Sequence, residues 1–293
     1  MKKAKLLLSF SIILLSVITL SCGQHYGTDN VFYRGNKVDN RIDYIHEIND
    51  VLPKNTKLKT KYRVLVLADV HVGSPRKETD IKPLLNWLDE YKKKNEDYYP
   101  IFALSLGDLV DHGTMAEYEK YDSIVKQIEN KGVHVVNVLG NHDLFNSGWE
   151  NYQKMCYPYC SLFKFETNKF SWYAIDTGTG DLGIKQYNIL KEAWAKDSKP
   201  KIVMMHYPIA NSRRFGTFCM HDTTERNLLI DLLAKNNAKA ALCGHLHQKQ
   251  AMDLQVYKEY GNPSLCYSEN GWTLFEIDES NESVTKIDIN EAF

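Results

Sequence analysis

Short apolar runs alternate with amphipathic segments from about residue 61 to the end of the chain. Such runs, separated by stretches long enough for a crossover helix, are typical of strands in a largely parallel sheet that is buried on both faces. The six predicted strands cover residues 64–68, 101–106, 133–139, 172–175, 201–205 and 238–243. This alternation predicts an α/β fold.

Two of the intervening segments have clear helical signatures. Residues 115–130 place their apolar side chains on one face at helical spacing, and Thr114 with Glu117 has the spacing of a capping box at the start. A second helix is predicted over residues 223–235, where leucines form an apolar stripe and Asp222 can cap the first turn.

The pattern changes after His247 to shorter alternating segments. Turn-forming residues at 261–263 and 269–271 interrupt them, which predicts antiparallel hairpin strands that close the domain. The sequence contains no internal repeat, low-complexity tract or linker after residue 61. We therefore expect one domain over residues 62–293.

The first 21 residues have the order of charge and apolarity that marks a secretory signal. Three lysines precede an apolar run over residues 6–20, which is shorter than the about 20 apolar residues of a membrane-spanning helix. The junction from Thr19 to Cys22 resembles the lipobox of bacterial lipoproteins, although most lipoboxes have an aliphatic residue in place of Thr19. We expect cleavage after residue 21 and a lipid on Cys22 that anchors the chain to a membrane of the bacterial cell envelope, outside the cytoplasm. Secretion without lipid and an uncleaved anchor are the alternatives.

Residues 22–61 are polar apart from a weak apolar cluster at 42–48, which predicts a tether with one short segment packed on the domain. The five cysteines that follow Cys22 are an odd number, so at least one thiol stays free. Cys156 and Cys160 are close enough in sequence to form a disulfide in an oxidising envelope, and buried free thiols are the alternative.

Composition and charge narrow the classes of partner. The chain of 293 residues is 43% hydrophobic and 25% charged, which is typical of a globular protein. Lys and Arg number 36 against 37 Asp and Glu, for a formal net charge of −1. A charge this small gives no indication that the chain binds a nucleic-acid polymer, although a local basic cleft stays open.

Candidate chemistry follows five of the predicted strands. Ligands in open α/β sheets collect at the carboxyl ends of strands, so polar residues at these ends can converge on one crevice. In extended chain, positions i and i+2 point the same way, so two ligands can come from one short motif. The motifs are Asp69-Val70-His71, Gly107-Asp108, Gly140-Asn141-His142-Asp143, the single His206, and Gly244-His245-Leu246-His247.

The mixture of oxygen and imidazole donors favours Mn, Fe or Zn over Mg or Ca. Seven ligands are too many for one tetrahedral zinc ion. The number fits two divalent or trivalent metal ions about 3.5–4 Å apart with a bridging carboxylate, an arrangement used in phosphoryl displacement.

These motifs, in this order, resemble those of the calcineurin-like metallophosphoesterases, and the resemblance covers about residue 64 to the chain end. It implies a sandwich of two packed mixed β-sheets flanked by helices, with a dinuclear metal site at the strand ends. It also assigns roles. Asp69, His71 and His247 would hold one metal; Asn141, His206 and His245 would hold the other; Asp108 would bridge them.

The resemblance further implies hydrolysis of a phosphomonoester or phosphodiester. A hydroxide held between two cations is a nucleophile at neutral pH. His142 would stabilise the phosphoryl charge or protonate the leaving alkoxide, oriented by a carboxylate from Asp111 or, as the local alternative, Asp143.

Two departures separate this chain from better-known relatives. Asp111 stands where purple acid phosphatases have an iron-binding tyrosine, and His112 stands where protein serine/threonine phosphatases have an arginine that grips phosphate. The first difference disfavours the purple acid phosphatases. The second disfavours the protein phosphatases, because imidazole cannot reproduce the bidentate fork of guanidinium. Two-domain nucleotidases are disfavoured because no residues remain for a large carboxy-terminal domain.

Substrate specificity is expected in loops beside the metals. Residues 208–221 contain Arg213, Arg214 and His221 together with two phenylalanines, a set that can bind a second phosphate or stack on a base. His112 is a further candidate for substrate contact. A solvated loop is the alternative, and a noncatalytic surface module that binds a partner on the same fold is the alternative function.

Overall fold

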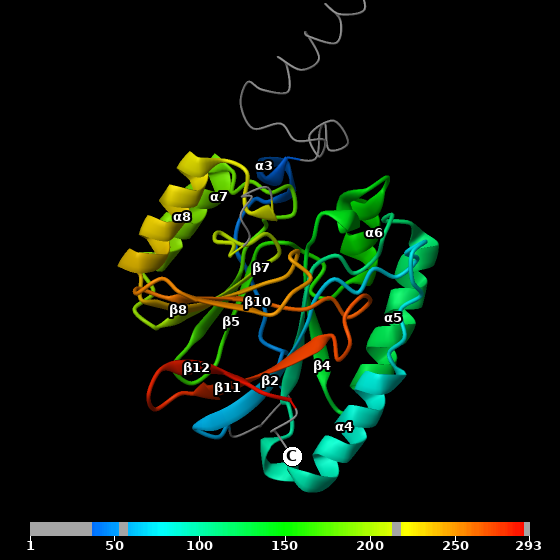
Figure 1. The fold of residues 1–293 in the computed structure, drawn as a ribbon. Coiled ribbons are helices and arrows are strands. Elements are labelled where there is room, and N and C mark those ends of the chain that lie inside the picture. Colours follow the sequence, from blue (N-terminus) through cyan, green and yellow to red (C-terminus); the bar gives the residue numbers. More distant parts are fainter. Residues whose placement is uncertain (1–36, 53–57, 213–217, 290–293) are drawn as a thin grey trace, which may run out of the picture.

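The computed structural model describes residues 37–52, 58–212 and 218–289. The predicted signal segment, the lipidation site Cys22, and Arg213 and Arg214 lie outside these residues. Within the described ranges, no helix is both long enough and apolar enough to cross a membrane. Two β-sheets pack face to face, and helices cover the outer face of each sheet (Figure 1).

The first sheet has five strands in the order β12-β11-β2-β3-β4. Strands β2, β3 and β4 are parallel, and β11 runs antiparallel to both of its neighbours. Their bounds are β2 Lys61–Leu67, β3 Phe102–Leu106, β4 His134–Val138, β11 Trp272–Asp278 and β12 Ser283–Ile287.

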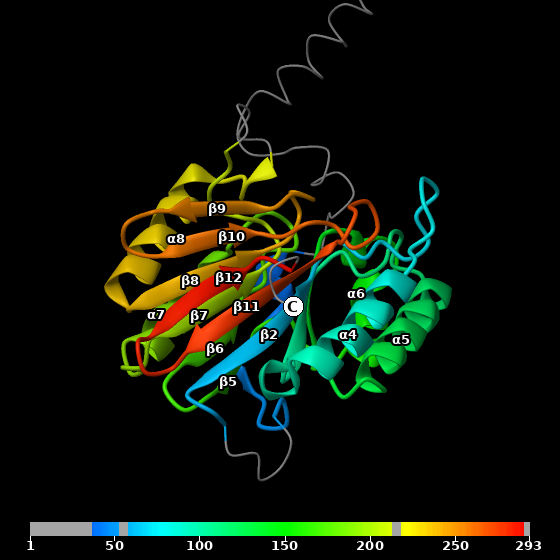
Figure 2. The same cartoon turned by 60° about the horizontal axis from the view of Figure 1, so that its bottom comes forward.

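The second sheet has seven strands in the order β1-β5-β6-β7-β8-β10-β9 (Figure 2). Strands β6, β7, β8 and β10 are parallel, whereas β5 and β9 pair antiparallel with their neighbours β6 and β10. Their bounds are β1 His46–Glu47, β5 Phe163–Glu166, β6 Ser171–Ala174, β7 Lys201–Met205, β8 Ala238–Cys243, β9 Gln250–Asp253 and β10 Lys258–Gly261.

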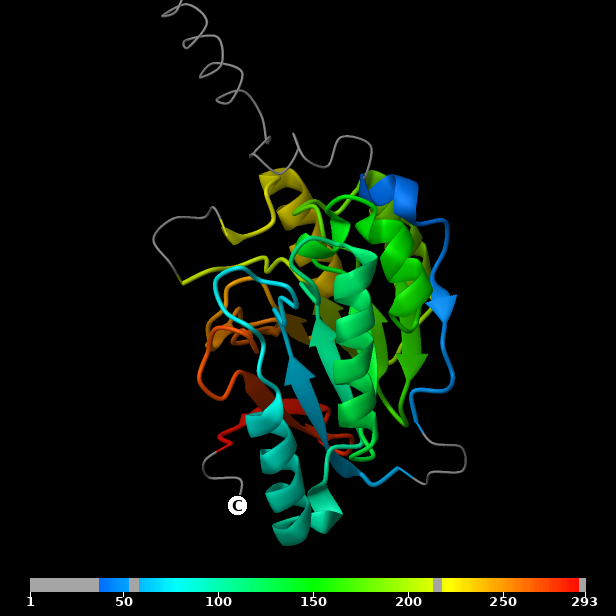
Figure 3. The same ribbon diagram turned by 90° about the vertical axis from the view of Figure 1, so that its right-hand side faces the viewer.

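The helices form the two outer layers (Figures 1 and 3). One group covers the five-stranded sheet and consists of α4 (Lys82–Lys94), α5 (Met115–Glu129) and α6 (Gly148–Met155). The other group covers the seven-stranded sheet and consists of α3 (Val38–Arg41), α7 (Ile184–Trp194) and α8 (Thr223–Lys235). The α/β sandwich of two mixed sheets flanked by helices, which the resemblance implied, is therefore confirmed.

Both faces of the central strands are buried, which explains why their apolar runs are nearly continuous. In β2, Val64 and Val66 face the layer between the sheets, whereas Leu65 and Leu67 face the helices of the first group. Alternate residues of a strand point to opposite faces, so a strand buried on both sides needs apolar residues at every position.

The six strands predicted from apolar runs correspond to β2, β3, β4, β6, β7 and β8. The capping box of α5 is present, and Asp222 accepts hydrogen bonds from the backbone of Thr224 and Glu225 at the start of α8. Strands β1 and β5 were not predicted, because β1 has only two residues and β5 alternates apolar and charged residues over four positions instead of forming a continuous apolar run.

The hairpins after His247 exist as β9–β10 and β11–β12, but the predicted turn positions are wrong. The hairpin turns lie at 254–257 and 279–282, whereas 262–271 connects one sheet to the other. Backbone hydrogen bonds from Asn262 to Cys243 and from Leu265 to Ala68 hold this connection against the ends of β8 and β2. The Gly, Asn and Pro residues of this segment therefore lie in a connection between the two sheets and not in a hairpin turn.

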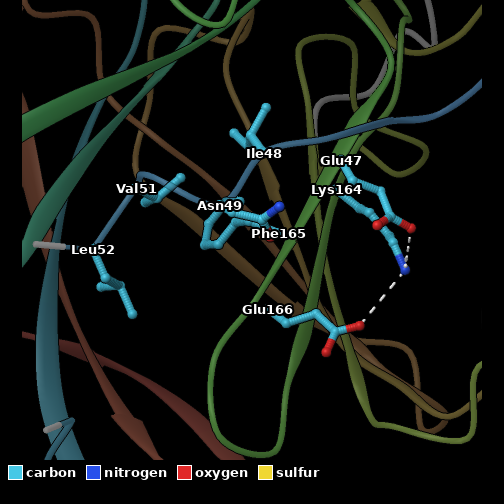
Figure 4. Close-up of a pocket in the computed structure, with 8 residues that line it drawn as sticks. All are labelled: Glu47, Ile48, Asn49, Val51, Leu52, Lys164, Phe165 and Glu166. Atoms are coloured by element: carbon cyan, nitrogen blue, oxygen red, sulfur yellow. Dashed lines mark ion pairs between the residues drawn. The ribbon is translucent and has the colours of Figure 1, made fainter. Parts of the chain in front are cut away.

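Two smaller features complete the fold. All five cysteines of the described chain are buried free thiols, including Cys156 and Cys160. A pocket of about 260 Å³ lies at the β1–β5 edge (Figure 4). Its carboxylates, Glu47 and Glu166, both pair with Lys164, at 3.1 and 3.6 Å. It therefore offers no free cluster of metal ligands.

Candidate metal centre

The carboxyl ends of β2, β3, β4, β7 and β8 meet, and the loops that follow them bring together all seven predicted metal ligands. Five of the seven have left-handed backbone conformations, with φ of 52° at Asp69, 48° at His71, 52° at Asp108, 65° at His245 and 53° at His247. Non-glycine residues in this region are strained, and such strain clusters at functional sites. Positive φ also occurs at six other non-glycine residues of the described chain, so the concentration of five such residues among the seven ligands supports the site without identifying it alone.

The first group of ligands consists of Asp69, His71, Asp108 and His247, whose donor atoms lie within 4.8 Å of one another. Nε2 of His247 is 3.2 Å from Oδ1 of Asp69, and Nε2 of His71 is 3.7 Å from Oδ2 of Asp108. Both carboxylates are buried, Asp69 completely. Three of these residues are the set predicted for one metal, and the fourth is the predicted bridge.

The second group consists of Asp108, His206 and His245, again within 4.8 Å. Oδ1 of Asn141 joins it at 2.9 Å from Nε2 of His206, and Oδ2 of Asp108 is 3.3 Å from the same nitrogen. Asp108, the residue predicted to bridge two metals, belongs to both groups. Neutral imidazole nitrogens and carboxylate oxygens in this mixture suit transition-metal ions.

Electrostatics of the buried site centre on Asp108. Burial opposes its charge, but the imidazoles of His206, His142 and His71 hold the pKa of the Asp108 carboxyl well below its ordinary value. Burial also disfavours charge on His206, yet Asp108 raises the pKa of that imidazole to about 9. Burial and the neighbouring His206 lower the pKa of His245 to about 3. Asp108 thus requires positive charge around it, which protons or metal ions can supply.

Partners outside the two groups orient the imidazoles. Nδ1 of His71 is 2.9 Å from Oδ1 of Asp111, and Nδ1 of His206 is 2.8 Å from the carbonyl oxygen of Leu106. When Nδ1 donates to such an acceptor, the lone pair of Nε2 points to the site, as in most protein metal centres.

His142 lies beside the two groups without belonging to the predicted ligand set. Its backbone N–H donates to Oδ1 of Asp108 at 2.8 Å, and its ring Nδ1 lies 2.8 Å from the carbonyl oxygen of Asp111. Burial opposes charge on the ring, but Asp108 and the Asp111 carbonyl raise the pKa of His142 above its ordinary value. The side chain is 30% exposed and lines a cavity of about 260 Å³ over the site.

The sequence predicts that a carboxylate orients His142. The structure shows that the acceptor is instead the backbone carbonyl of Asp111. The Asp111 carboxylate is 3.6 Å from Nδ1 of His142 and bonds His71 instead. The Asp143 carboxylate accepts hydrogen bonds from the backbone of Leu109, Val110 and Gly140 and so holds the loops after β3 and β4. Burial, and next the charge of Asp108, raise the pKa of Asp143 to about 7.

Gly140 permits the close approach of these two loops. A Cβ atom at this position would lie 2.1 Å from the backbone nitrogen of Asp108 and 2.4 Å from its Oδ1. Any side chain here would displace the residue that both ligand groups share.

Of the residues predicted to contact substrate, His112 and His221 lie among the described residues. Nδ1 of His112 is 3.0 Å from Oε1 of Glu117, and the ring is half exposed beside Asp111. The backbone N–H of His221 donates to Gly180, and its ring lies 5.3 Å from Tyr207. His221 is thus next to the second ligand group, and His112 is at the rim of the first.

Two aromatic residues next to the predicted ligands could not be recognised as part of the site from the sequence. The ring of Tyr207 stacks on His245 at 3.7 Å, and the ring of Tyr267 lies 5.3 and 5.4 Å from His71 and His247. From sequence alone, most of the tyrosines are expected to be packing residues. Only the position of Tyr207, directly after His206, could have indicated a place beside the metal ligands. Tyr267 carries no such signal, because it reaches the site through the connection between β10 and β11.

Comparison with known proteins agrees with this geometry. The family model of the calcineurin-like phosphoesterases matches residues 62–249, well over half of the chain. The chain therefore belongs to the calcineurin-like phosphoesterase family, and its Asp and His clusters are suited to binding metal ions.

Individual relatives are distant. A probable cyclic nucleotide phosphodiesterase of Psychrobacter arcticus is 23% identical over 177 residues, which are 55% of this chain and 62% of that relative. A dimetal phosphatase from Danio rerio superposes with a TM-score of 0.57 at 10% identity, over 73% of this chain and 92% of its own. GAP50, the anchor in the inner membrane complex of Plasmodium, superposes with a TM-score of 0.55 at 17% identity, over 80% of this chain and 87% of the GAP50 chain. At these identities the solved structures establish the fold alone.

Proposed function

We propose that this chain is a metal-dependent hydrolase of phosphomonoesters or phosphodiesters that works at a two-metal centre outside the cytoplasm. The observation that carries the proposal is the position of Asp108, whose carboxylate belongs to both ligand groups. A buried carboxylate flanked on each side by imidazoles fits a bridge between two cations better than it fits a single ion.

The residues divide between two Mn, Fe or Zn ions as the family motifs suggest. Asp69, His71 and His247 hold one ion, and Asn141, His206 and His245 hold the other. When bound, such ions make a nucleophile of water at neutral pH and neutralise charge on the phosphoryl oxygens.

His142 is the group of this chain that exchanges a proton with the substrate. Its Nδ1 is engaged by the Asp111 carbonyl, so Nε2 is the nitrogen that can reach the leaving oxygen. In the imidazolium form it donates a proton to the alkoxide as the phosphorus–oxygen bond breaks.

The cavity over the site supports a nucleotide ester as the first substrate to test. Phe218, 41% exposed, forms part of its wall and offers a ring on which a base can stack. The relative from Psychrobacter arcticus bears the description of a probable cyclic nucleotide phosphodiesterase. A lipid head group is the second candidate, because the lipobox-like junction at Cys22 suggests a membrane anchor and an extracytoplasmic site.

A noncatalytic binding module on the same fold is the alternative function. Its support is the likeness in fold to GAP50 of Plasmodium, which is described as an anchor. The complete set of seven ligands and the strained backbone around them favour the enzyme instead.

Hydrolysis of p-nitrophenyl phosphate and of its bis ester, with Mn, Zn or Fe, separates the two functions. We expect turnover by the wild type, and a loss of at least about 10³-fold in Asp108→Asn, because removing a group that acts in the transition state costs several kcal/mol. Asp97→Asn is the matched control, since Asp97 is an exposed carboxylate that pairs with Lys59. Equal turnover in the wild type and Asp108→Asn would end the enzyme hypothesis, and metal binding without any turnover would favour the binding module.

A further inference from the structure

Arg41 and Asp176 form a buried ion pair although 135 positions separate them. Nε and one terminal nitrogen of Arg41 each donate to a different carboxylate oxygen of Asp176, both at 2.8 Å. The two side chains are 1% and 0% exposed. A bidentate arginine–carboxylate pair is among the strongest and most directional contacts available to side chains.

Arg41 belongs to an N-terminal segment that is fixed to the domain along its length. This segment, residues 38–48, contains α3 and β1 and runs along the seven-stranded sheet (Figure 3, blue). Val38 and Ile42 are buried in the core beneath α7 and α8, and Asp39 accepts a hydrogen bond from the backbone of Lys185 in the first turn of α7. Strand β1 pairs with β5. The segment therefore has a defined place and lies outside residues 62–249, which the family model matches.

Asp176 begins a loop, residues 176–180, that supports the second ligand group. Its Oδ1 accepts a hydrogen bond from the backbone of Gly178 at 3.0 Å. The hydroxyl oxygen of Thr177 accepts hydrogen bonds from the backbone N–H groups of His206 and Tyr207, at 3.1 and 2.9 Å.

The same loop reaches the other side of the second group. A Cβ atom at Gly178 would lie 3.2 Å from the carbonyl oxygen of Gly140, directly before Asn141. The carbonyl oxygen of Gly180 accepts the backbone N–H of His221 at 2.7 Å. The loop thus accepts a hydrogen bond from the backbone of His206 and lies close to the residue before Asn141. The hydrogen bonds and ion pairs of Asp69, His71 and His247 involve other elements.

We propose that Arg41 is a positioning residue for one half of the metal centre: through Asp176 and the 176–180 loop it fixes His206, whose ring lies 2.9 Å from the side-chain oxygen of Asn141. The proposal rests on the proposed function, since it concerns affinity for the second of two metal ions. Removing Arg41 leaves a buried carboxylate without its cation. Asp176 can respond by taking up a proton or by moving toward water, and the proposal concerns the movement. That movement shifts the hydroxyl that holds the backbone of His206. Changes of this kind behind a metal ligand typically cost about 10–100-fold in metal affinity.

The test is a calorimetric titration of metal-free protein with Mn²⁺, supported by the Mn²⁺ electron paramagnetic resonance spectrum. We expect the wild type to bind two ions. In Arg41→Met one of the two sites should weaken about 10–100-fold while the other keeps its wild-type affinity. Arg41→Lys, which keeps the charge but loses the planar fork, should show the same selective loss to a smaller degree and provides a folded variant if Arg41→Met does not fold. Adding His71→Ala to Arg41→Lys should then abolish the remaining tight site.

Arg63→Met is the matched control. Arg63 lies in β2 and forms a half-buried ion pair with Glu276 at 3.4 Å, away from the carboxyl end of the strand. Its loss should lower stability and leave both Mn²⁺ affinities unchanged. The positioning role would be overturned if Arg41→Met or Arg41→Lys bound both Mn²⁺ ions with the affinities of the wild type. It would also be overturned if both sites weakened equally. A wild type that binds fewer than two ions would instead overturn the two-metal proposal itself.

Discussion

Nε2 of His71 lies 3.2 Å from Nε2 of His247, although 176 positions separate the two residues. Nδ1 of His71 is engaged by the Asp111 carboxylate, which favours the tautomer with a lone pair on Nε2. Two imidazole nitrogens that face each other at this distance need a proton or a cation between them. The loops after β2 and β8 therefore place two imidazole nitrogens where they can share a proton or bind one cation together.

The role of His142 can be tested through the leaving group. If its Nε2 protonates the leaving oxygen, His142→Ala should lower kcat by about 10²–10⁴-fold for an alkyl or phenyl phosphate. The loss should be much smaller for p-nitrophenyl phosphate, because p-nitrophenolate leaves without a proton. Steady-state kinetics on a series of aryl phosphates measures the difference. The same loss for every leaving group would contradict a proton-donor role.

Asp111 has a separate role that a substitution can isolate. Asp111→Ala removes the carboxylate bonded to His71 but keeps the backbone carbonyl bonded to His142. We expect metal affinity to fall by about 10–100-fold, while the dependence of kcat on the leaving group at saturating metal stays as in the wild type. A leaving-group dependence like that of His142→Ala would mean that the carboxylate, and not the carbonyl, orients His142.

Thr177 should contribute to stability as well as to the site. Its hydroxyl is buried and accepts two backbone hydrogen bonds. In Thr177→Val both N–H groups lose their acceptor, so the free energy of unfolding should fall by about 1–3 kcal/mol. Urea denaturation measures this change, and Thr177→Ser is the control because it keeps the hydroxyl. A loss of stability in Thr177→Ser with none in Thr177→Val would indicate that packing of the methyl group, and not the hydroxyl, is what matters.

Glu259 predicts a pH dependence of stability outside the metal centre. The residue is fully buried and accepts hydrogen bonds from the backbone of Ile209 and Ala210. Burial raises the pKa of Glu259 from 4.5 to about 7, against the opposing effect of the two amides. Because the folded pKa lies above the unfolded one, this group stabilises the fold most below pH 4.5, and that contribution is lost as the pH rises through about 7.

Comparison with Glu259→Gln isolates this contribution, since glutamine does not titrate. Between pH 4.5 and pH 8 the wild type should lose unfolding free energy on the order of 3 kcal/mol relative to Glu259→Gln. Urea unfolding of metal-free protein at the two pH values measures it. A difference that stays constant with pH would show that Glu259 has an ordinary pKa in the folded protein.

The strands and the ligand loops could be predicted because both depend on local sequence. Val64 and Leu65 are apolar for the same reason, burial on opposite faces of one strand, and Asp69 and His71 follow where that strand ends. The order of the motifs then indicated which loops meet. A sequence pattern predicts structure where the burial of a residue depends on its position along its own strand.

Contacts between distant segments could not be predicted in the same way. Arg41 and Asp176 are each an ordinary charged residue in sequence, and only the fold places one beside the other. The orientation of His142 by the Asp111 carbonyl was missed because any residue supplies a carbonyl, so the sequence carries no sign of it. The turns of the last hairpins were misplaced because Gly, Asn and Pro also favour a crossing between two sheets.

Anomalous X-ray scattering from a crystal of the chain reconstituted with Mn or Zn tests the two-metal centre most directly. We predict two peaks about 3.5–4 Å apart, one on each side of the Asp108 carboxylate. One peak should have Asp69, His71 and His247 as neighbours, and the other Asn141, His206 and His245. A single peak, or peaks away from Asp108, would contradict the account.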